Sequence, residues 1–258
     1  MASTAALNEK DHTTLGLSES GPLAYAGESV ELRSRPGCPL LVDPGQSVTA
    51  EQFGIIRTRL LNARSKTGIR SLLVTSPEKR DGKTFTSLNL AISLAQLQNE
   101  RILLIDGDLR LKGITRNLEL GQKVGFADYL QRFAPFQACI HATSLSHLCI
   151  VPAGNVMGTS LPAILEGQPL PNFLNTAGQE FDLIIVDSVP VLAPIADFEL
   201  LLAACDGALL VVHLRKTARG AVDVTSQRLG NKLLGVVINN AEFDKHADYH
   251  ASYVDTRG

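Results

Sequence analysis

The sequence predicts an α/β fold in which a doubly wound, mostly parallel sheet is covered by helices on both faces. Short apolar runs alternate with segments of helical periodicity from Ser71 onward. These runs are apolar on both faces of a strand, which is typical of a parallel sheet buried between two helical layers. At 258 residues, the chain is long enough to build one such domain around a substantial core.

The expected elements follow in order along the chain. The first is a helix that opens at Thr49, with Phe53, Ile56 and Leu60 on one apolar stripe. A second helix is expected over residues 84–97, where apolar residues recur three and four positions apart. Buried strands are expected over residues 71–75, 101–105, 148–151, 183–186, 208–212 and 234–238.

Three regions are expected along the chain. Residues 1–45 show little apolar periodicity and contain the breakers Arg35-Pro36-Gly37 and Asp43-Pro44-Gly45, so we expect a flexible N-terminal arm there. Residues 46–240 are expected to form the α/β domain. Residues 241–258 are expected to form a flexible tail that contains tyrosines.

Composition narrows the possible classes of function. A formal net charge of -2 argues against general nucleic-acid binding, which needs a basic surface. No stretch approaches the roughly 18 apolar residues of a membrane span, and the first residues lack the pattern of a signal peptide. The four cysteines show no C-x-x-C spacing and fit small buried side chains in a reducing compartment. We therefore expect a cytoplasmic protein without a nucleic-acid partner.

The connection between the first expected strand and the following helix carries a phosphate-binding pattern. Residues 77–84 have the spacing G-x-x-x-x-G-K-[ST], with Pro77 at the first glycine position. Gly82 lets the backbone approach phosphate oxygens, Lys83 supplies a positive charge, and the Thr84 hydroxyl can bind Mg2+. The alternative is a polar turn that contains Gly-Lys-Thr by chance. The strand before it and the helix after it favour a P-loop for ATP and Mg2+, with nucleotide contacts from Asp81, Gly82, Lys83, Thr84 and Phe85.

Carboxylates follow two further expected strands. Asp106 and Asp108 follow one strand, and Asp187 follows another in the manner of a Walker B strand. Alternate residues of an extended segment share a face, so Asp106 and Asp108 can point at one ion. A single Asp after a strand is more simply a turn former or a helix cap. Three in a chain with a Gly-Lys-Thr loop favour a metal and catalytic site, on strands expected to neighbour the P-loop strand.

The pattern Asp106-x-Asp108-x-Arg110 on an apolar strand resembles the Walker A′ motif of the bacterial tyrosine autokinases (BY-kinases) of capsule and exopolysaccharide loci. These kinases are a branch of the deviant Walker A P-loop ATPases. The resemblance covers about residues 43–240. Further matches are Gly125-Phe-Ala-Asp-Tyr-Leu130, Asp187-x-x-Pro190 and Gly235-Val-Val-Ile-Asn239.

The resemblance implies a protein-tyrosine kinase that transfers the γ-phosphoryl group of Mg·ATP to tyrosines of its own tail. It leaves open whether Asp106 or Asp108 is the base. The implied catalytic residues are Lys83, Asp106 and Asp108. The implied metal ligands are Thr84, Asp106 and Asp187, and further nucleotide contacts would come from Arg110 and Asn239. The implied phosphoacceptors are Tyr249 and Tyr253.

The resemblance also implies partners. Such kinases work with a membrane-spanning activator, a chain-length regulator, and this sequence shows no span of its own. We therefore expect a separate activator that meets the kinase at the inner face of the plasma membrane. Glu51 and Arg57 match a helix through which the family self-associates, but Gly54 replaces its first arginine. A homo-oligomer is thus left open.

Two other readings remain. The first is a partitioning- or division-type ATPase that hydrolyses ATP and recruits a partner without phosphorylating protein. Arg110, and Glu78 at the place of a signature lysine, favour the kinase over this switch, whereas Gly54 and the few tail tyrosines favour the switch. The second is a nucleotide-binding regulator without turnover, which Pro77 and Arg80 keep open.

Overall fold

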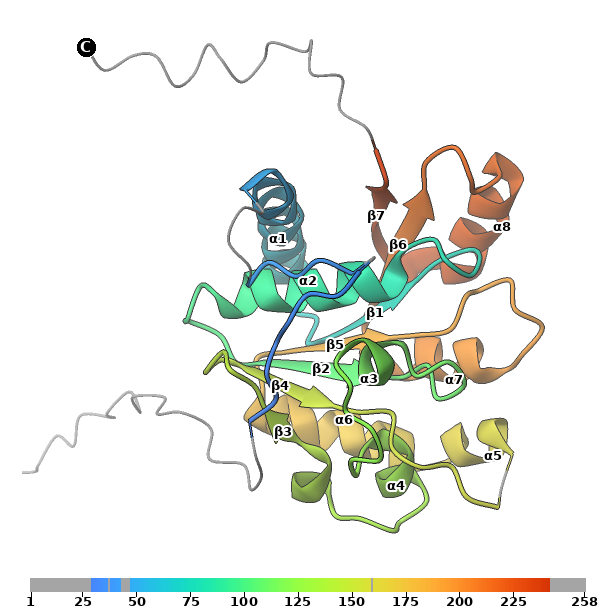
Figure 1. The fold of residues 1–258 in the computed structure, drawn as a ribbon. Coiled ribbons are helices and arrows are strands. Elements are labelled where there is room, and N and C mark those ends of the chain that lie inside the picture. The colour runs from blue at the N-terminus through green and yellow to red at the C-terminus, as the bar shows by residue number, and fades with distance from the viewer. Residues whose placement is uncertain (1–28, 37, 43–46, 159, 242–258) are drawn as a thin grey trace, which may run out of the picture.

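The structure is a computed structural model that describes residues 29–36, 38–42, 47–158 and 160–241. Its centre is a seven-stranded sheet in which all neighbouring strands run parallel except one antiparallel pair at an edge (Figure 1). The strands are β1 (Ser71–Thr75), β2 (Ile102–Asp106), β3 (His141–Ala142), β4 (Leu148–Val151), β5 (Leu183–Asp187), β6 (Gly207–His213) and β7 (Leu233–Asn239). Their order across the sheet is β3-β4-β2-β5-β1-β6-β7, with β3 antiparallel to β4.

Helices cover both faces of this sheet, so the fold has three layers. On one face lie α1 (Ser47–Thr67), α2 (Lys83–Ala95) and α3 (Gly113–Asn117). On the other lie α4 (Phe126–Leu130), α5 (Leu161–Leu165), α6 (Pro169–Glu180), α7 (Asp197–Ala204) and α8 (Arg219–Leu229). The 3-10 turns η1 (Phe136–Cys139) and η2 (Gly230–Lys232) complete the elements. No helix in the described part of the chain is both long enough and apolar enough to span a membrane.

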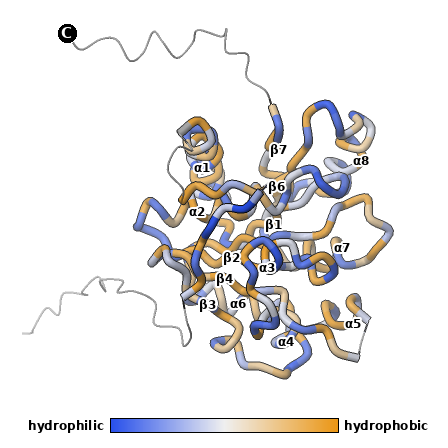
Figure 2. The backbone as a smooth tube through the Cα atoms, viewed as in Figure 1, coloured by the Kyte–Doolittle hydropathy of each residue, from blue (hydrophilic) through white to orange (hydrophobic). Residues whose placement is uncertain are grey.

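The central strands supply both hydrophobic cores at once. Successive residues of β1 alternate, with Leu72 and Val74 in the core under α1 and α2 and Leu73 in the opposite core. The same alternation runs along β2, where Leu104 and Ile105 belong to different cores. Figure 2 shows hydrophobic residues concentrated along these inner strands. A strand with two buried faces must be apolar throughout, which explains the continuous apolar runs of the sequence.

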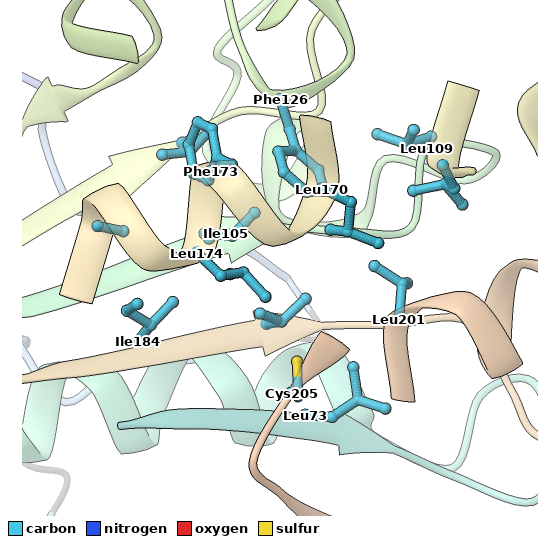
Figure 3. Close-up of a cluster of buried hydrophobic side chains, with 14 of the residues drawn as sticks. Leu73, Ile105, Leu109, Phe126, Leu170, Phe173, Leu174, Ile184, Leu201 and Cys205 are labelled. Atoms are coloured by element: carbon cyan, nitrogen blue, oxygen red, sulfur yellow. The ribbon is translucent and has the colours of Figure 1, made fainter. Parts of the chain in front are cut away.

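Four aromatic rings anchor the core beneath α4 and α6. The Phe173 ring lies 5.1 Å from that of Phe126 and 4.9 Å from those of Tyr129 and Phe136, measured between centroids. Figure 3 shows Phe126 and Phe173 together on the helical side of the strand residues Ile105 and Ile184. Edge-to-face contacts of this kind add to the hydrophobic gain from burial.

The fold class predicted from the sequence is confirmed, and each of the six expected strands is present with ends shifted by at most a residue or so. One expectation about their arrangement is wrong. Only β5 of the two carboxylate-bearing strands neighbours β1, because β5 lies between β1 and β2. The two-residue β3 was not expected, since so short a strand leaves no period in the sequence.

The described part of the expected N-terminal arm packs against the domain. Val30 pairs with the edge of the sheet, since its N–H donates to the Ala142 carbonyl at 2.8 Å. Leu40 is buried in the core under α2. The side chain of Asn89, itself buried in α2, accepts a hydrogen bond from the Leu41 N–H at 2.9 Å and donates to the Pro39 carbonyl at 3.0 Å. These described residues of the expected arm thus pack against the domain, because side chain-to-backbone hydrogen bonds and a few apolar residues can hold a segment without any periodic pattern.

The aromatic cluster generates a stability prediction. Phe173→Ala should lower the free energy of unfolding by about 3–5 kcal/mol, because the ring is fully buried and its loss leaves a cavity. The matched control is Phe133→Ala, since that ring is 65% exposed and its removal should change little. Urea unfolding followed by circular dichroism measures both. Equal effects of the two substitutions would contradict the packing described.

Candidate active site

The connection from β1 to α2 forms a phosphate loop whose backbone depends on glycine at position 82. Arg80 and Gly82 both adopt left-handed conformations, with φ of 64° and 100°. A Cβ on Gly82 would lie 1.9 Å from Nδ2 of Asn239 on β7, so no side chain fits there. Helix α2 begins at Lys83, which leaves its first N–H groups free to face an anion.

Asp187, at the end of β5, is held by two hydroxyls of α2. Thr84 Oγ1 donates to Asp187 Oδ2 at 2.7 Å, and Ser87 Oγ donates to Oδ1 at 3.1 Å. Burial raises the pKa of Asp187 to about 6, although the positive charge of Lys83 opposes that change. Asp187 and the P-loop threonine therefore lie where a metal ion bound to a nucleotide would need them.

Asp106 faces Asp187 directly in the sheet, because the register of β2 and β5 pairs the two residues. Its Oδ2 accepts hydrogen bonds from the Thr115 N–H at 2.8 Å and the Thr115 hydroxyl at 2.7 Å. Its Oδ1 is buried without a hydrogen-bond partner. Burial, helped by the neighbouring Asp187 charge, raises the pKa of Asp106 to about 7.

Asp108 and Lys83 form a buried ion pair beside these two carboxylates. The Lys83 ammonium lies 3.4 Å from Asp108 Oδ2, and both side chains are largely shielded from solvent. Asp108 Oδ1 accepts the Leu111 N–H at 3.0 Å, whereas Oδ2 accepts no hydrogen bond. Asp106 Oδ1 and Asp108 Oδ2 thus each retain the capacity to accept a hydrogen bond, the second of them beside the Lys83 ammonium.

The donor set fits a magnesium ion held jointly by protein and phosphate. No group of three His, Cys, Asp or Glu side chains within the described ranges forms a complete metal cage. Mg2+ usually takes one or two carboxylates plus phosphate oxygens and water, so a full cage is not needed. The Thr84 hydroxyl and Asp187 would supply the expected pair of ligands, and the unpartnered oxygen of Asp106 lies on the neighbouring strand.

Two cavities meet at this edge of the sheet. The larger, about 850 Å3, is lined by the P-loop from Gly82 to Phe85 and by Asn239. It is also lined by residues of the N-terminal segment, including Arg35 and Cys38. The smaller, about 480 Å3, is lined by Asp108 and Arg110, by residues 77–79, and by the apolar residues Val189, Pro190, Leu192, Ala193, Pro194 and Ile195.

Most of the residues expected from the sequence converge here. The structure brings together the segment 81–85, the three aspartates and Asn239. Asn239 Nδ2 donates to the Asp81 carbonyl at 3.0 Å, so it also holds the P-loop. Arg110 lies at the smaller cavity and makes two hydrogen bonds, at 2.8 and 3.1 Å, to Asp197. Tyr249 and Tyr253 lie outside the described residues.

Several site residues were missed by the sequence reasoning. Ser87 lies one helical turn after Thr84, and this spacing could have identified it. Thr115 had no signal, because its contact with Asp106 depends on the loop between β2 and α3. Gly113 was missed for the same reason; a Cβ there would lie 2.6 Å from Thr84 Oγ1, so the start of α3 can approach the P-loop only as glycine.

The buried Asp106 generates a pH prediction for the metal-free protein. The fold raises the pKa of this carboxyl from 3.8 to about 7, so between these values the folded chain holds a proton that the unfolded chain has lost. The contribution of Asp106 to stability should therefore fall, on the order of a few kcal/mol, as the pH rises from about 4 to about 7.

Denaturant unfolding in EDTA measures this as the difference between wild type and Asp106→Asn at each pH. The asparagine variant cannot titrate at this position, so it serves as the reference. A difference that is constant with pH, or that grows with it, would contradict the prediction.

Comparison with known proteins extends these observations. Residues 80–228 match the family described as AAA domain. The chain is 30% identical over 208 residues to tyrosine-protein kinase YwqD of Bacillus subtilis, which covers 79% of this chain and 86% of that protein. It is 27% identical over 215 residues to succinoglycan biosynthesis transport protein ExoP of Rhizobium meliloti, covering 81% of this chain but 27% of that protein. The kinase domain of Escherichia coli tyrosine kinase ETK is 26% identical with a TM-score of 0.68, covering 78% of this chain and 80% of that one.

These matches agree with the geometry of the site. The AAA match spans more than half of the chain, and YwqD matches over most of the length of both proteins. The Gly82-Lys83-Thr84 segment and the paired strand ends at Asp106 and Asp187 lie within the matched region. The chain belongs to the family of bacterial tyrosine-protein kinases that are built on a P-loop nucleotide-binding domain.

Proposed function

We propose that this protein is an ATP-dependent protein-tyrosine kinase that phosphorylates tyrosines of its own C-terminal tail and regulates the synthesis or export of a polysaccharide. The observation that carries this proposal is the Lys83–Asp108 pair, 3.4 Å apart, where the two cavities meet. Lys83 lines the larger cavity and Asp108 the smaller. A phosphoryl donor and a hydroxyl acceptor can thus approach from two sides.

The larger cavity is proposed to hold ATP. The free N–H groups at the start of α2 and the Lys83 ammonium would bind the phosphates. Phe85 and Asn239 line the same cavity and are proposed as further nucleotide contacts, with Asn239 facing the adenine. Arg110 is proposed as a nucleotide contact on the side of the smaller cavity. Mg2+, when bound by Thr84 and Asp187, would neutralise charge on the transferred phosphoryl group.

The smaller cavity is proposed to admit the acceptor tyrosine. Its apolar wall, from Val189 to Ile195, suits an aromatic ring, and Asp108 lies at its inner end. Asp108 Oδ2 has no hydrogen-bond partner and can accept the proton of the tyrosine hydroxyl. Asp106 lines neither cavity and is held by Thr115, so its proposed role is to bind the metal or its water.

The proposed partner is a separate membrane-spanning activator that the kinase meets at the inner face of the plasma membrane. The relative ExoP, which is much longer than this chain and is named a biosynthesis transport protein, supports a link to polysaccharide export. A homo-oligomer through α1 stays a proposal. Arg57 of that helix donates to the Ser93 carbonyl at 2.7 Å and to its hydroxyl at 3.0 Å, so within the chain it is already engaged.

The kinase reading is favoured over a partitioning- or division-type switch. The relatives that match over most of their length are named tyrosine-protein kinases. The cavity beside Asp108 supports the same choice, since a switch that transfers phosphate only to water needs no room for a side chain.

Lys83→Met should abolish tyrosine phosphorylation while the chain remains folded. Removing this charge from the phosphate site should slow phosphoryl transfer by about 100-fold or more. The measurement is a phosphotyrosine blot of protein incubated with activator and Mg·ATP. Lys66→Met, at the exposed end of α1, is the matched control and should behave as wild type. Undiminished phosphotyrosine in Lys83→Met would contradict the assigned site.

The tail tyrosines generate a second test. Intact-mass analysis should show phosphate on wild type, less of it on Tyr249→Phe or Tyr253→Phe, and none on the double variant. Tyr129→Phe is the control, because that ring packs in the core and only its hydroxyl is lost. ATP hydrolysis without any added phosphate on the wild-type chain would instead support the switch.

A further inference from the structure

A lysine from outside the P-loop contacts it from the side of β6. Lys216 lies in the connection between β6 and α8, next to the loop from β1 to α2 (Figure 1). Its ammonium donates to the Lys79 carbonyl at 2.6 Å and to Asp81 Oδ1 at 2.8 Å. One side chain thus joins two positions of the P-loop to a strand end distant in sequence.

The connection that carries Lys216 forms a turn that is closed by hydrogen bonds to the end of β6. The N–H groups of Lys216 and Thr217 donate to the His213 carbonyl at 3.2 and 3.0 Å. The Thr217 hydroxyl in turn accepts the His213 N–H at 3.1 Å. Because this turn is fastened to the end of β6, the backbone from which the lysine extends is held in place, and the partly exposed side chain loses less conformational entropy when it contacts the P-loop.

The Lys216 ammonium compensates the charge of the buried Asp81 carboxylate. This carboxylate is fully buried, and its Oδ2 accepts the Glu78 N–H at 2.9 Å. A buried carboxylate is costly unless a positive charge and hydrogen bonds compensate it. Lys216 provides the charge, since its ammonium forms the ion pair with this carboxylate.

The same carboxylate lies next to the place where phosphate must bind. Asp81 directly precedes Gly82 and Lys83 in the P-loop. An uncompensated negative charge at this position would repel the phosphates of a nucleotide. The two residues that flank Asp81, Arg80 and Gly82, are both left-handed, so the loop also needs contacts that hold this backbone.

We propose that Lys216 is a positioning residue for phosphate binding: its ammonium neutralises the buried Asp81 carboxylate and fixes the P-loop in the shape that receives the nucleotide. It acts through the loop, because both of its hydrogen bonds go to loop atoms. The inference rests on the proposed function only in taking the larger cavity as the nucleotide site.

The test is direct measurement of Mg·ATP and Mg·ADP affinity by calorimetry on the full-length chain. Lys216→Met should weaken both by about 10–100-fold. At saturating ATP, the rate of phosphorylation should change by much less, so that KM rises while kcat holds. Adding Asp81→Asn to Lys216→Met should restore most of the affinity, because the unpaired charge is then gone.

Lys232→Met is the matched control for a merely structural lysine. The Lys232 ammonium donates to three carbonyls, those of Leu202, Ala203 and Cys205, at 2.7, 3.0 and 2.8 Å. It precedes β7, at the opposite end of the strands from the P-loop. This variant should lower the melting temperature and leave nucleotide affinity unchanged.

Three results would overturn the inference: wild-type affinity in Lys216→Met, an equal loss of affinity in Lys232→Met, or no restoration by Asp81→Asn. The proposed function can be contradicted independently of this inference. If nucleotide affinity depends on Lys216 as expected but the wild-type protein never phosphorylates tyrosine, this inference stands and the proposed kinase activity is removed.

Discussion

Three carboxylates and one lysine share a buried site at the carboxyl edge of the sheet. Burying these charges together costs free energy, and the surrounding structure offsets part of that cost. Asp106 and Asp187 face each other across β2 and β5, and Asp108 lies two residues further on beside Lys83. Burial is the main reason that the pKa values of Asp106 and Asp187 are both raised, and the charges of neighbouring carboxylates add to this effect. The hydroxyls of Thr84, Ser87 and Thr115 offset part of this cost through hydrogen bonds. A cation and the phosphates of a nucleotide would change the balance further, so the site is built to be completed by its ligands.

The sheet order explains how this concentration of charge arises. Strand β5 lies between β1 and β2, so the ends of three adjacent strands bring the P-loop, Asp187 and the pair Asp106 and Asp108 to one edge. The two cores on either side of these strands keep them in register, because a slip by one residue would turn every buried side chain to the wrong face. The positions of the site residues at the edge of the sheet therefore depend on the packing of the two hydrophobic cores along β1, β2 and β5.

Local sequence patterns predicted the strands, α2 and the P-loop well, because periodicity and glycine placement are local properties. The parts that escaped prediction depend on contacts between distant segments. The order of β2, β5 and β1 is a tertiary property that no strand encodes alone. Thr115 reaches Asp106, and Lys216 reaches Asp81, through loops whose course only the folded chain defines. The segment before α1 escaped because it is held by one buried asparagine and a few apolar side chains, and so leaves no repeating signal.

That segment has a consequence for the lining of the larger cavity. Arg35, Pro36, Cys38 and Pro39 line this cavity, yet they belong to no strand of the seven-stranded sheet. Asn89 of α2 accepts the Leu41 N–H and donates to the Pro39 carbonyl, and the side chains of Cys38 and Leu40 are buried in the core under α2. Another part of the lining is the P-loop from Gly82 to Phe85, which connects β1 to α2. The shape of the cavity therefore depends on side-chain contacts with a segment outside the sheet as well as on the strands themselves.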